Sequence, residues 1–187
     1  MKDRLERGEM GLAFHGSSRK IARFTSTKVG RGADSNSSLG LYLSHVPLNA
    51  LDYAENSNAS GEGDTIVVYV VAYPANGLAH EMSPDEFFGV ADDDSLQPPC
   101  HFSNLRSDLL AKGFDRAECD TGEDAITVVL DPDRCEIVAV LDQEAIEKLE
   151  CSGVDCLDSM ALLEAITPHL PSPGKNRKSM AGTHEYP

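Results

Sequence analysis

The stretch that decides the fold is Thr65-Ile66-Val67-Val68-Tyr69-Val70-Val71-Ala72-Tyr73, the clearest strand in the sequence. Its residues are mostly β-branched or aromatic and almost continuously apolar, which is typical of a strand buried on both faces of a sheet. Pro74 ends it, because proline has no N–H to donate to a neighbouring strand. The sequence therefore predicts a central strand with covering layers on both sides.

Shorter apolar segments around this strand predict the rest of the domain. Further strands are expected over residues 11–15, 39–43, 114–120, 126–130 and 135–141. Helical spacing predicts helices over residues 47–55, 104–112, 143–150 and 157–166, and one or two helical turns over residues 19–24. Residues 81–99 are acidic and predict a helix followed by an insertion loop. Several short strands with helices between them indicate a small α+β domain.

Composition excludes several classes of protein. The 187 residues are 41% hydrophobic, which is enough for a core and excludes general disorder. The net charge of −15 repels nucleic-acid backbones and anionic lipids, so bulk nucleic-acid binding is not expected. No apolar run approaches the roughly 20 residues of a membrane span. The charged first residues do not resemble a signal peptide, so we expect a cytoplasmic protein.

The cysteines favour a reducing compartment. There are five of them, and no two are spaced as a C-x-x-C pair. An odd number without close pairs argues against a disulfide framework and against a structural zinc site. The histidines are also scattered without ligand spacing, so no metal is expected.

Two motifs provide candidates for binding a ligand. His15 ends a predicted strand and is followed by Gly16 and Ser17, and a glycine there lets a ligand approach the backbone. Tyr42 follows Gly40-Leu41, and Tyr53 comes eleven residues later in a predicted helix. Two such rings can hold a flat heteroaromatic group between them. The structural alternatives are a hydrogen-bonded histidine at a strand edge and two core tyrosines.

Two charged clusters complete the candidate residues. Carboxylates gather before the strand expected at Ile126, where they can stabilise a developing cation: Glu118, Asp120, Glu123 and Asp124. Five basic residues fall within thirteen positions without an acid among them, which favours an anionic ligand such as a diphosphate: Arg19, Lys20, Arg23, Lys28 and Arg31. The structural alternatives are a solvated acidic turn and an exposed basic loop.

Taken in order, these motifs resemble the ADP-ribosyltransferase superfamily of the diphtheria-toxin and poly-ADP-ribose-polymerase type. Its pattern of His-Gly, then Gly-x-Tyr, then a second tyrosine eleven residues later corresponds to His15-Gly16, Gly40-Leu41-Tyr42 and Tyr53. The short spacing, together with the stretches at residues 113–117 and 128–132, is similar to the compact bacterial and phage branch. The resemblance covers about residues 10–141.

The resemblance implies a small split β-sheet fold and a mono-ADP-ribosyltransferase with an effector-like or toxin-like role. NAD is then the co-substrate, bound by residues 1–141, with helices over 142–170 packed on this domain and a flexible tail over 171–187. It implies that His15 binds a ribose hydroxyl, Gly16 binds the nicotinamide carboxamide, and Tyr42 and Tyr53 stack on nicotinamide. Ser17 is a polar neighbour, and a basic residue such as Arg23 meets the diphosphate.

One position departs from the pattern of the superfamily. The glutamate that usually opens the last strong strand corresponds to Ile126. In the compact branch the acid can come from the preceding strand or turn, so Asp120 is favoured, with Glu118 and Glu123 as alternatives. The departure leaves open an NAD glycohydrolase, or an inactive module of the same fold that binds NAD or a partner. The acidic surface favours a basic target protein, and we expect a monomer.

Overall fold

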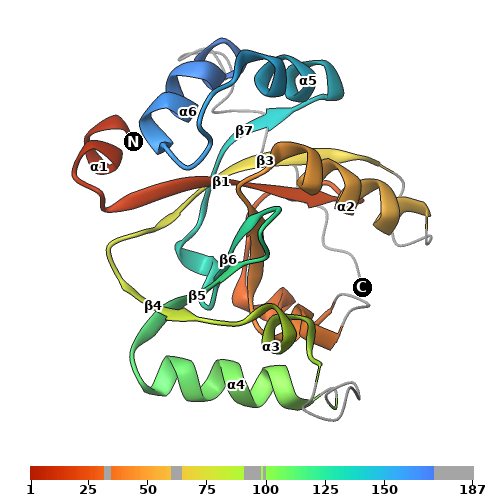
Figure 1. Ribbon diagram of the computed structural model, residues 1–187, viewed down its shortest axis with the longest axis vertical. Coiled ribbons are helices and arrows are strands. Elements are labelled where there is room, and N and C mark those ends of the chain that lie inside the picture. Colours follow the sequence, from red (N-terminus) through yellow and green to blue (C-terminus); the bar gives the residue numbers. More distant parts are fainter. Residues whose placement is uncertain (32–34, 60–64, 91–97, 99, 171–187) are drawn as a thin grey trace.

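The structure is a computed structural model, and it describes residues 1–31, 35–59, 65–90, 98 and 100–170 (Figure 1). The tail expected over residues 171–187 lies outside this part of the chain, as do residues 91–97 and 99 of the acidic insertion. None of the described helices combines the length and the apolar character needed to cross a bilayer.

Helices and strands alternate along the described chain. The α-helices are Lys2–Glu6 (α1), Pro47–Ala59 (α2), Pro84–Phe88 (α3), Cys100–Ala111 (α4), Gln143–Ser152 (α5) and Ser159–Ile166 (α6). The strands are Met10–Ser17 (β1), Leu41–Ser44 (β2), Val67–Pro74 (β3), Leu78–Glu81 (β4), Phe114–Asp120 (β5), Ala125–Val129 (β6) and Glu136–Leu141 (β7). Short 3₁₀ helices are Ser26–Lys28 (η1), Ser35–Ser38 (η2), Pro132–Arg134 (η3) and Thr167–His169 (η4).

The strands form one sheet in the order β4-β5-β6-β2-β1-β3-β7, which has two distinct halves. Only β4 and β5 run parallel; the other neighbours are antiparallel. β1 and β3 pair along eight residues, whereas β1 and β2 pair only at Phe14 and Ser44. The halves β4-β5-β6-β2 and β1-β3-β7 are therefore joined at one point. The α+β class is confirmed. The sheet divides into two halves because β1 and β2 are paired at a single position.

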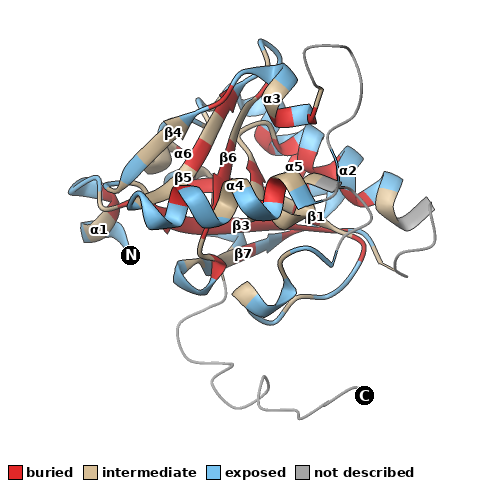
Figure 2. Ribbon diagram, turned by 90° about the horizontal axis from the view of Figure 1, so that it is seen from below, coloured by how far each residue is buried: buried red, intermediate tan, exposed pale blue. Residues whose placement is uncertain are grey.

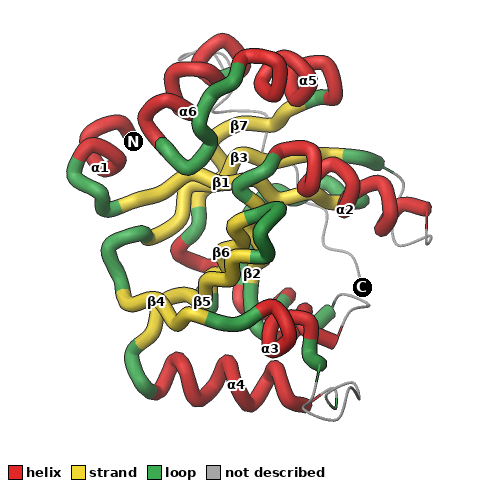
Figure 3. Tube along the Cα trace, viewed as in Figure 1, coloured by secondary structure: helices red, strands yellow, loops and turns green. Residues whose placement is uncertain are grey.

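Three hydrophobic cores hold the layers together. The first lies between β1-β3-β7 and helices α2, α5 and α6, and includes Phe14, Val70 and Ile146. The second lies between the two half-sheets and includes Ala13, Phe24, Leu43, Tyr69 and Val129. The third lies under α3 and α4 and includes Leu39, Phe87, Phe102, Val128 and Leu130. Figure 3 shows α5 and α6 at one end of the molecule and α3 and α4 at the other.

Strand β3 has the position that its sequence predicts. All eight of its residues are buried, because the first core covers one face and the second core covers the other. Neighbouring residues of β1 divide in the same way, with Phe14 in the first core and Ala13 in the second. In Figure 2, β3 has the colour of buried residues, whereas the helices also carry exposed ones. The prediction of a strand buried on both faces is confirmed.

Two local predictions need correction. Residues 19–24 are not helical but form an irregular segment, here called the strap, because tertiary contacts take the place of local helical bonds. The Tyr69 hydroxyl accepts a hydrogen bond from the Ile21 N–H, and Phe24 is buried in the second core. Strand β4 was not predicted. Its four residues are held by β5, which is distant in sequence, and not by a strong local pattern.

Candidate functional site

His15 lies where the two half-sheets separate. Its Nδ1 atom is 3.0 Å from the backbone carbonyl oxygen of Tyr42 on β2, just beyond the single β1–β2 pair. A carbonyl oxygen can only accept, so Nδ1 carries the hydrogen and Nε2 of the neutral ring is left as an acceptor. Burial lowers the pKa of His15 below the usual value for histidine, and the bond to Tyr42 opposes this only in part. His15 is therefore a neutral, oriented imidazole at neutral pH.

Two aromatic rings hold the imidazole of His15 in place. Phe24 meets it edge-on, with ring centroids 5.2 Å apart. Tyr69 of β3 lies 6.5 Å away with its ring nearly parallel, at an interplanar angle of 30°. Both rings belong to the second core and are buried. The ring of His15 is thus fixed by packing on one side and by the Tyr42 carbonyl at Nδ1.

The strap of residues 19–24 crosses the second core beside His15. The hydroxyl of Tyr69 accepts a hydrogen bond from the Ile21 N–H at 2.6 Å, and its oxygen lies 3.5 Å from the Arg19 carbonyl oxygen. Further along, Ser26 fixes the chain through bonds to Asp131 and Asp133. The strap is therefore anchored at both ends.

The basic residues of this region all point to solvent. Arg19, Lys20, Arg23, Lys28 and Arg31 are exposed. The side chain of Lys20 makes no ion pair with a described residue. Hydrogen bonds from Ser26 are the main reason why the pKa of the Asp133 carboxyl is lowered. The charge of Arg23, which lies near Asp133, lowers it further. The region can therefore offer positive charge to an anion next to His15.

Gly16 and Ser17 have clear structural contacts. A Cβ atom on Gly16 would lie 1.7 Å from the Ala50 carbonyl oxygen, because α2 packs its backbone directly against β1. This close approach requires glycine whatever the role of its N–H and C=O groups. The Oγ atom of Ser17 accepts a hydrogen bond from the Arg19 N–H at 3.1 Å, at the start of the strap.

The two candidate tyrosines have different surroundings. Tyr42 directs its ring to the face of β2 that carries the third core, where it meets Phe87 with centroids 5.4 Å apart. Its hydroxyl donates to the backbone oxygen of Asn36 at 2.8 Å. Tyr53 is on α2 and is 49% exposed. Tyr42 therefore meets His15 through its backbone, while Tyr53 offers an exposed ring.

The candidate carboxylates already have partners. Glu118 accepts a 2.6 Å hydrogen bond from Arg116 two residues away on β5, and Arg116 is mostly buried. Asp120 is exposed at the end of β5 and accepts from the Gly122 N–H at 2.8 Å within the turn. Glu123 is exposed in the same turn. Because Glu118 and Asp120 are two residues apart on β5, they share the strand face opposite Ala117 and Cys119, which belong to the third core.

Comparisons with known proteins give two distant structural likenesses. No protein-family model matches the sequence, and no curated protein matches it. The crystal structure of the M. tuberculosis MbcT-MbcA toxin-antitoxin complex matches at a TM-score of 0.48 and 9% identity, over 80% of this chain and 96% of that one. An anti-CRISPR protein matches at a TM-score of 0.39 and 13% identity, over 68% and 94% of the two chains.

A polar cluster beside the junction of the half-sheets was not singled out from the sequence. Asp124 is 8% exposed and accepts hydrogen bonds from Ser44 Oγ at 2.6 Å and from the His45 N–H at 3.1 Å. Since Ser44 forms the single pair with Phe14, Asp124 fixes the chain at that point. The only signal in the sequence was its place in the acidic cluster, which does not distinguish a buried carboxylate from a solvated one.

His45 belongs to the same cluster. Its Nε2 atom lies 3.2 Å from the hydroxyl of Thr127, and its buried Nδ1 atom has no hydrogen-bond partner of normal geometry among the described residues. Burial lowers the pKa of His45, while the backbone of Cys156 and the charges of Asp124 and Glu118 act in the opposite direction. This histidine is a second neutral imidazole inside the fold.

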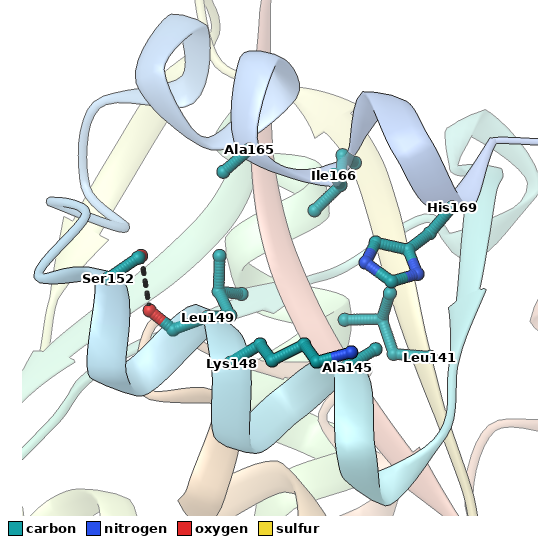
Figure 4. Close-up of a pocket in the computed structure, with 8 residues that line it drawn as sticks. All are labelled: Leu141, Ala145, Lys148, Leu149, Ser152, Ala165, Ile166 and His169. Atoms are coloured by element: carbon teal, nitrogen blue, oxygen red, sulfur yellow. Dashed lines mark hydrogen bonds between the residues drawn. The ribbon is translucent and has the colours of Figure 1, made fainter.

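Two cavities lie away from His15. One of about 160 Å³ lies between α5 and the segment α6–η4, with Lys148 and His169 among apolar side chains (Figure 4). The other, of about 400 Å³, is lined by charged residues that include Arg4, Arg134 and Glu136. Neither is lined by His15, Tyr42 or Tyr53.

Two of the cysteines, Cys135 and Cys156, have thiols of raised pKa. Burial raises the pKa of Cys135 to about 12 and that of Cys156 to about 11, so both thiols stay protonated and poorly nucleophilic near neutral pH. The described residues contain no group of three histidine, cysteine, aspartate or glutamate side chains arranged to hold a metal ion.

Proposed function

We propose that this protein is an NAD-dependent mono-ADP-ribosyltransferase with an effector-like or toxin-like role. It would cleave the bond between nicotinamide and ribose and transfer ADP-ribose to a target protein. The observation that carries the proposal is the bond between His15 Nδ1 and the Tyr42 carbonyl, at the point where the half-sheets separate. It brings together two of the three motifs on which the superfamily resemblance rests, His15-Gly16 and Gly40-Leu41-Tyr42.

His15 would bind NAD through Nε2. Because Nδ1 donates to Tyr42, Nε2 of the neutral ring can accept a hydrogen bond from a ribose hydroxyl. The lowered pKa of this half-buried ring supports the role, since a protonated imidazole would have no acceptor left. The backbone of Gly16 would bind the carboxamide of nicotinamide, and the exposed ring of Tyr53 would stack on nicotinamide. The ring of Tyr42 could join it only by leaving its contact with Phe87 in the third core.

The reaction needs one stabilising carboxylate. When the glycosidic bond breaks, its electron pair leaves with nicotinamide, which is then neutral, and the ribose gains oxocarbenium character. Asp120, or Glu118 on the same strand face, would stabilise this cation. A nucleophile of the acceptor then attacks the ribose carbon and loses its proton. Residues 1–141 would form this NAD-binding domain, on which α5 and α6 pack through the first core.

An inactive binding module is the second candidate, and specific observations favour it. Ile126 directs its side chain to the third core, Glu118 is bonded to Arg116, and Asp120 is bonded within its turn. Such a protein would bind NAD or a partner without cleaving NAD. The third possibility, an NAD glycohydrolase, differs from the transferase only in using water as the acceptor.

One experiment distinguishes the three functions. The full chain is incubated with NAD labelled in its adenine half and with a cell lysate, and nicotinamide, free ADP-ribose and labelled protein are quantified. A transferase gives nicotinamide and labelled protein in matching amounts, with the modified side chain located by mass spectrometry. Free ADP-ribose without labelled protein indicates a glycohydrolase, and no nicotinamide above background indicates a binding module.

A further inference from the structure

The proposed function does not use the cavity between α5 and the segment α6–η4. The volume of this cavity is about 160 Å³. Apolar side chains from three elements line it: Leu141 of β7, Ala145 and Leu149 of α5, and Ala165 and Ile166 of α6. Figure 4 shows Leu149 pointing from one helix, and Ala165 and Ile166 from the other, into the space between them. Such a space is unusual between packed helices, because protein interiors are packed as closely as organic crystals.

The inner wall of this cavity is buried and apolar. Four of its residues are buried members of the first core: Leu141, Ala145, Leu149 and Ile166. The polar side chains that line the cavity belong to exposed residues, among them Lys148 and Ser152. A water molecule in a cavity needs about two to four polar partners, which apolar side chains do not provide. An apolar cavity of about 150 Å³ instead holds a molecule of the size of benzene, so this volume fits one six-membered ring.

The polar groups beside this wall favour an uncharged ligand with one hydrogen-bond donor. The Lys148 ammonium is already paired with the Glu144 carboxylate at 2.6 Å, and the net charge of −15 opposes a bound anion. The Ser152 hydroxyl donates to the Leu149 carbonyl at 2.5 Å and accepts a long bond of 3.4 Å from the Val154 N–H. Because a hydroxyl oxygen has two lone pairs, Ser152 can accept one further hydrogen bond.

We infer that this cavity binds a small monocyclic phenol, with its ring among the apolar side chains and its hydroxyl donating to Ser152 Oγ. A phenol combines an apolar ring of the right volume with the single donor that Ser152 can accept. The bound ring would contact β7, α5 and α6 together, so it would stabilise the packing of both helices on the sheet. The inference does not rest on the proposed function, because neither His15 nor the candidate tyrosines line this cavity.

Calorimetry on the full chain tests this site with two probes, phenol and toluene, which carry a hydroxyl and a methyl group on the same ring. Both probes should bind to the wild type, because both rings match the apolar wall. Ser152→Ala should weaken phenol binding about fivefold, the effect of one lost hydrogen bond, and leave toluene binding unchanged. A purely structural role of Ser152 would instead change the affinity for both probes equally.

Filling the cavity from either helix provides a second test. Ala165→Leu on α6 and Ala145→Val on α5 place additional carbon atoms in the space that the ring would occupy. Each should lower the affinity for both probes at least about tenfold. Ala165→Leu should also keep or raise the melting temperature, because filling an apolar cavity adds packing contacts. Ala111→Leu is the matched control, since Ala111 is exposed at the end of α4, and it should bind both probes as the wild type does.

Amide resonances of the wild type locate the site without any substitution. Phenol should shift the resonances of Leu149 and Ile166 and leave those of β4 unchanged, and this readout decides the matter if a filling variant does not fold. The inference would be overturned if the wild type bound neither probe, if both filling variants kept wild-type affinity, or if Ala111→Leu lost as much affinity as they do. Equal effects of Ser152→Ala on both probes would contradict the hydrogen bond to Ser152.

Discussion

The Nδ1 atom of His15 and the backbone oxygen of Tyr42 lie 3.0 Å apart, across the gap that opens after the single β1–β2 pair. The His15 side chain on β1 thus bonds to the Tyr42 backbone on β2, at a point where backbone pairing between these two strands has ended. This contact fixes the tautomer of His15 and leaves Nε2 available to a ligand.

Gly16→Ala should destabilise the fold. The added Cβ would meet the Ala50 carbonyl oxygen at 1.7 Å, and the obstacle is backbone of α2, which cannot move aside as a flexible side chain can. We expect a loss of about 3 kcal/mol in the free energy of unfolding, at the upper end of typical overpacking. Urea denaturation followed by circular dichroism measures it.

Gly153→Ala is the control for Gly16→Ala. Gly153 ends α5 with a φ of +67° and has open space where a Cβ would lie. Its replacement therefore costs only backbone strain of about 1 kcal/mol. An effect of Gly16→Ala no larger than this would show that α2 does not approach β1 as closely as described.

The two half-buried histidines, His15 and His45, should make the stability of the fold depend on pH. Burial lowers the pKa of both His15 and His45, so the unfolded chain binds more protons than the folded one between the folded pKa values and about 6.5. Their contribution is complete above pH of about 6.5 and falls as the pH drops below it. Each ring contributes a slope of at most about 1.4 kcal/mol per pH unit.

The pH dependence is measured from urea midpoints at several pH values between about 5 and 7, above the range in which ordinary carboxylates titrate. His45→Gln should flatten the slope, because it removes one titrating ring without touching His15. A slope that is unchanged in His45→Gln would mean that this ring is not buried in its neutral form.

The carboxylates on β5 should differ in their effect on catalysis. Asp120→Ala should lower nicotinamide release about 10²-fold or more, the scale expected for one preorganised electrostatic group. Affinity for NAD should change little, because the charge acts mainly while the bond is breaking. Glu118→Ala should have an intermediate effect and Glu123→Ala a mild one. Steady-state kinetics of nicotinamide release measures all three.

Glu118→Gln separates the two roles open to Glu118. The amide oxygen can still accept from Arg116, so the fold should keep its stability while the negative charge is lost. If Asp120→Ala is fully active and Glu118→Gln is inactive, the catalytic carboxylate is Glu118. If every carboxylate variant is fully active, no carboxylate of this strand or turn takes part.

The sequence predicted the fold where a strong local pattern and burial coincide. Strand β3 was visible because both of its faces are buried, and β5 was predicted with the bounds Phe114–Asp120 that the structure gives. Residues 19–24 were predicted to be helical, but contacts with Tyr69 and with the second core, which the local sequence does not reveal, hold them in an irregular conformation. Strand β4 was missed because its order comes from pairing with β5.

The candidate site was predictable in its motifs but not in its contacts. The positions of His15 and Tyr42 could be read from the chain, whereas the bond between them depends on how far β1 and β2 diverge. Likewise, the sequence places Glu118 and Asp120 on one strand face but does not reveal that Arg116 and Gly122 bind them. Contacts between segments distant in sequence determine which charged groups have partners.

The central claim is that His15 serves NAD cleavage, and the most direct test compares nicotinamide release by the wild type, His15→Ala and His169→Ala. His169 is exposed and distant from β1 in sequence, so its replacement controls for loss of an imidazole. Provided that the three proteins have the same melting temperature, the wild type and His169→Ala should release nicotinamide at equal rates. His15→Ala should be at least about tenfold slower, or about 1.4 kcal/mol of transition-state binding. Equal release by all three proteins, or none above background from the wild type, would contradict the claim.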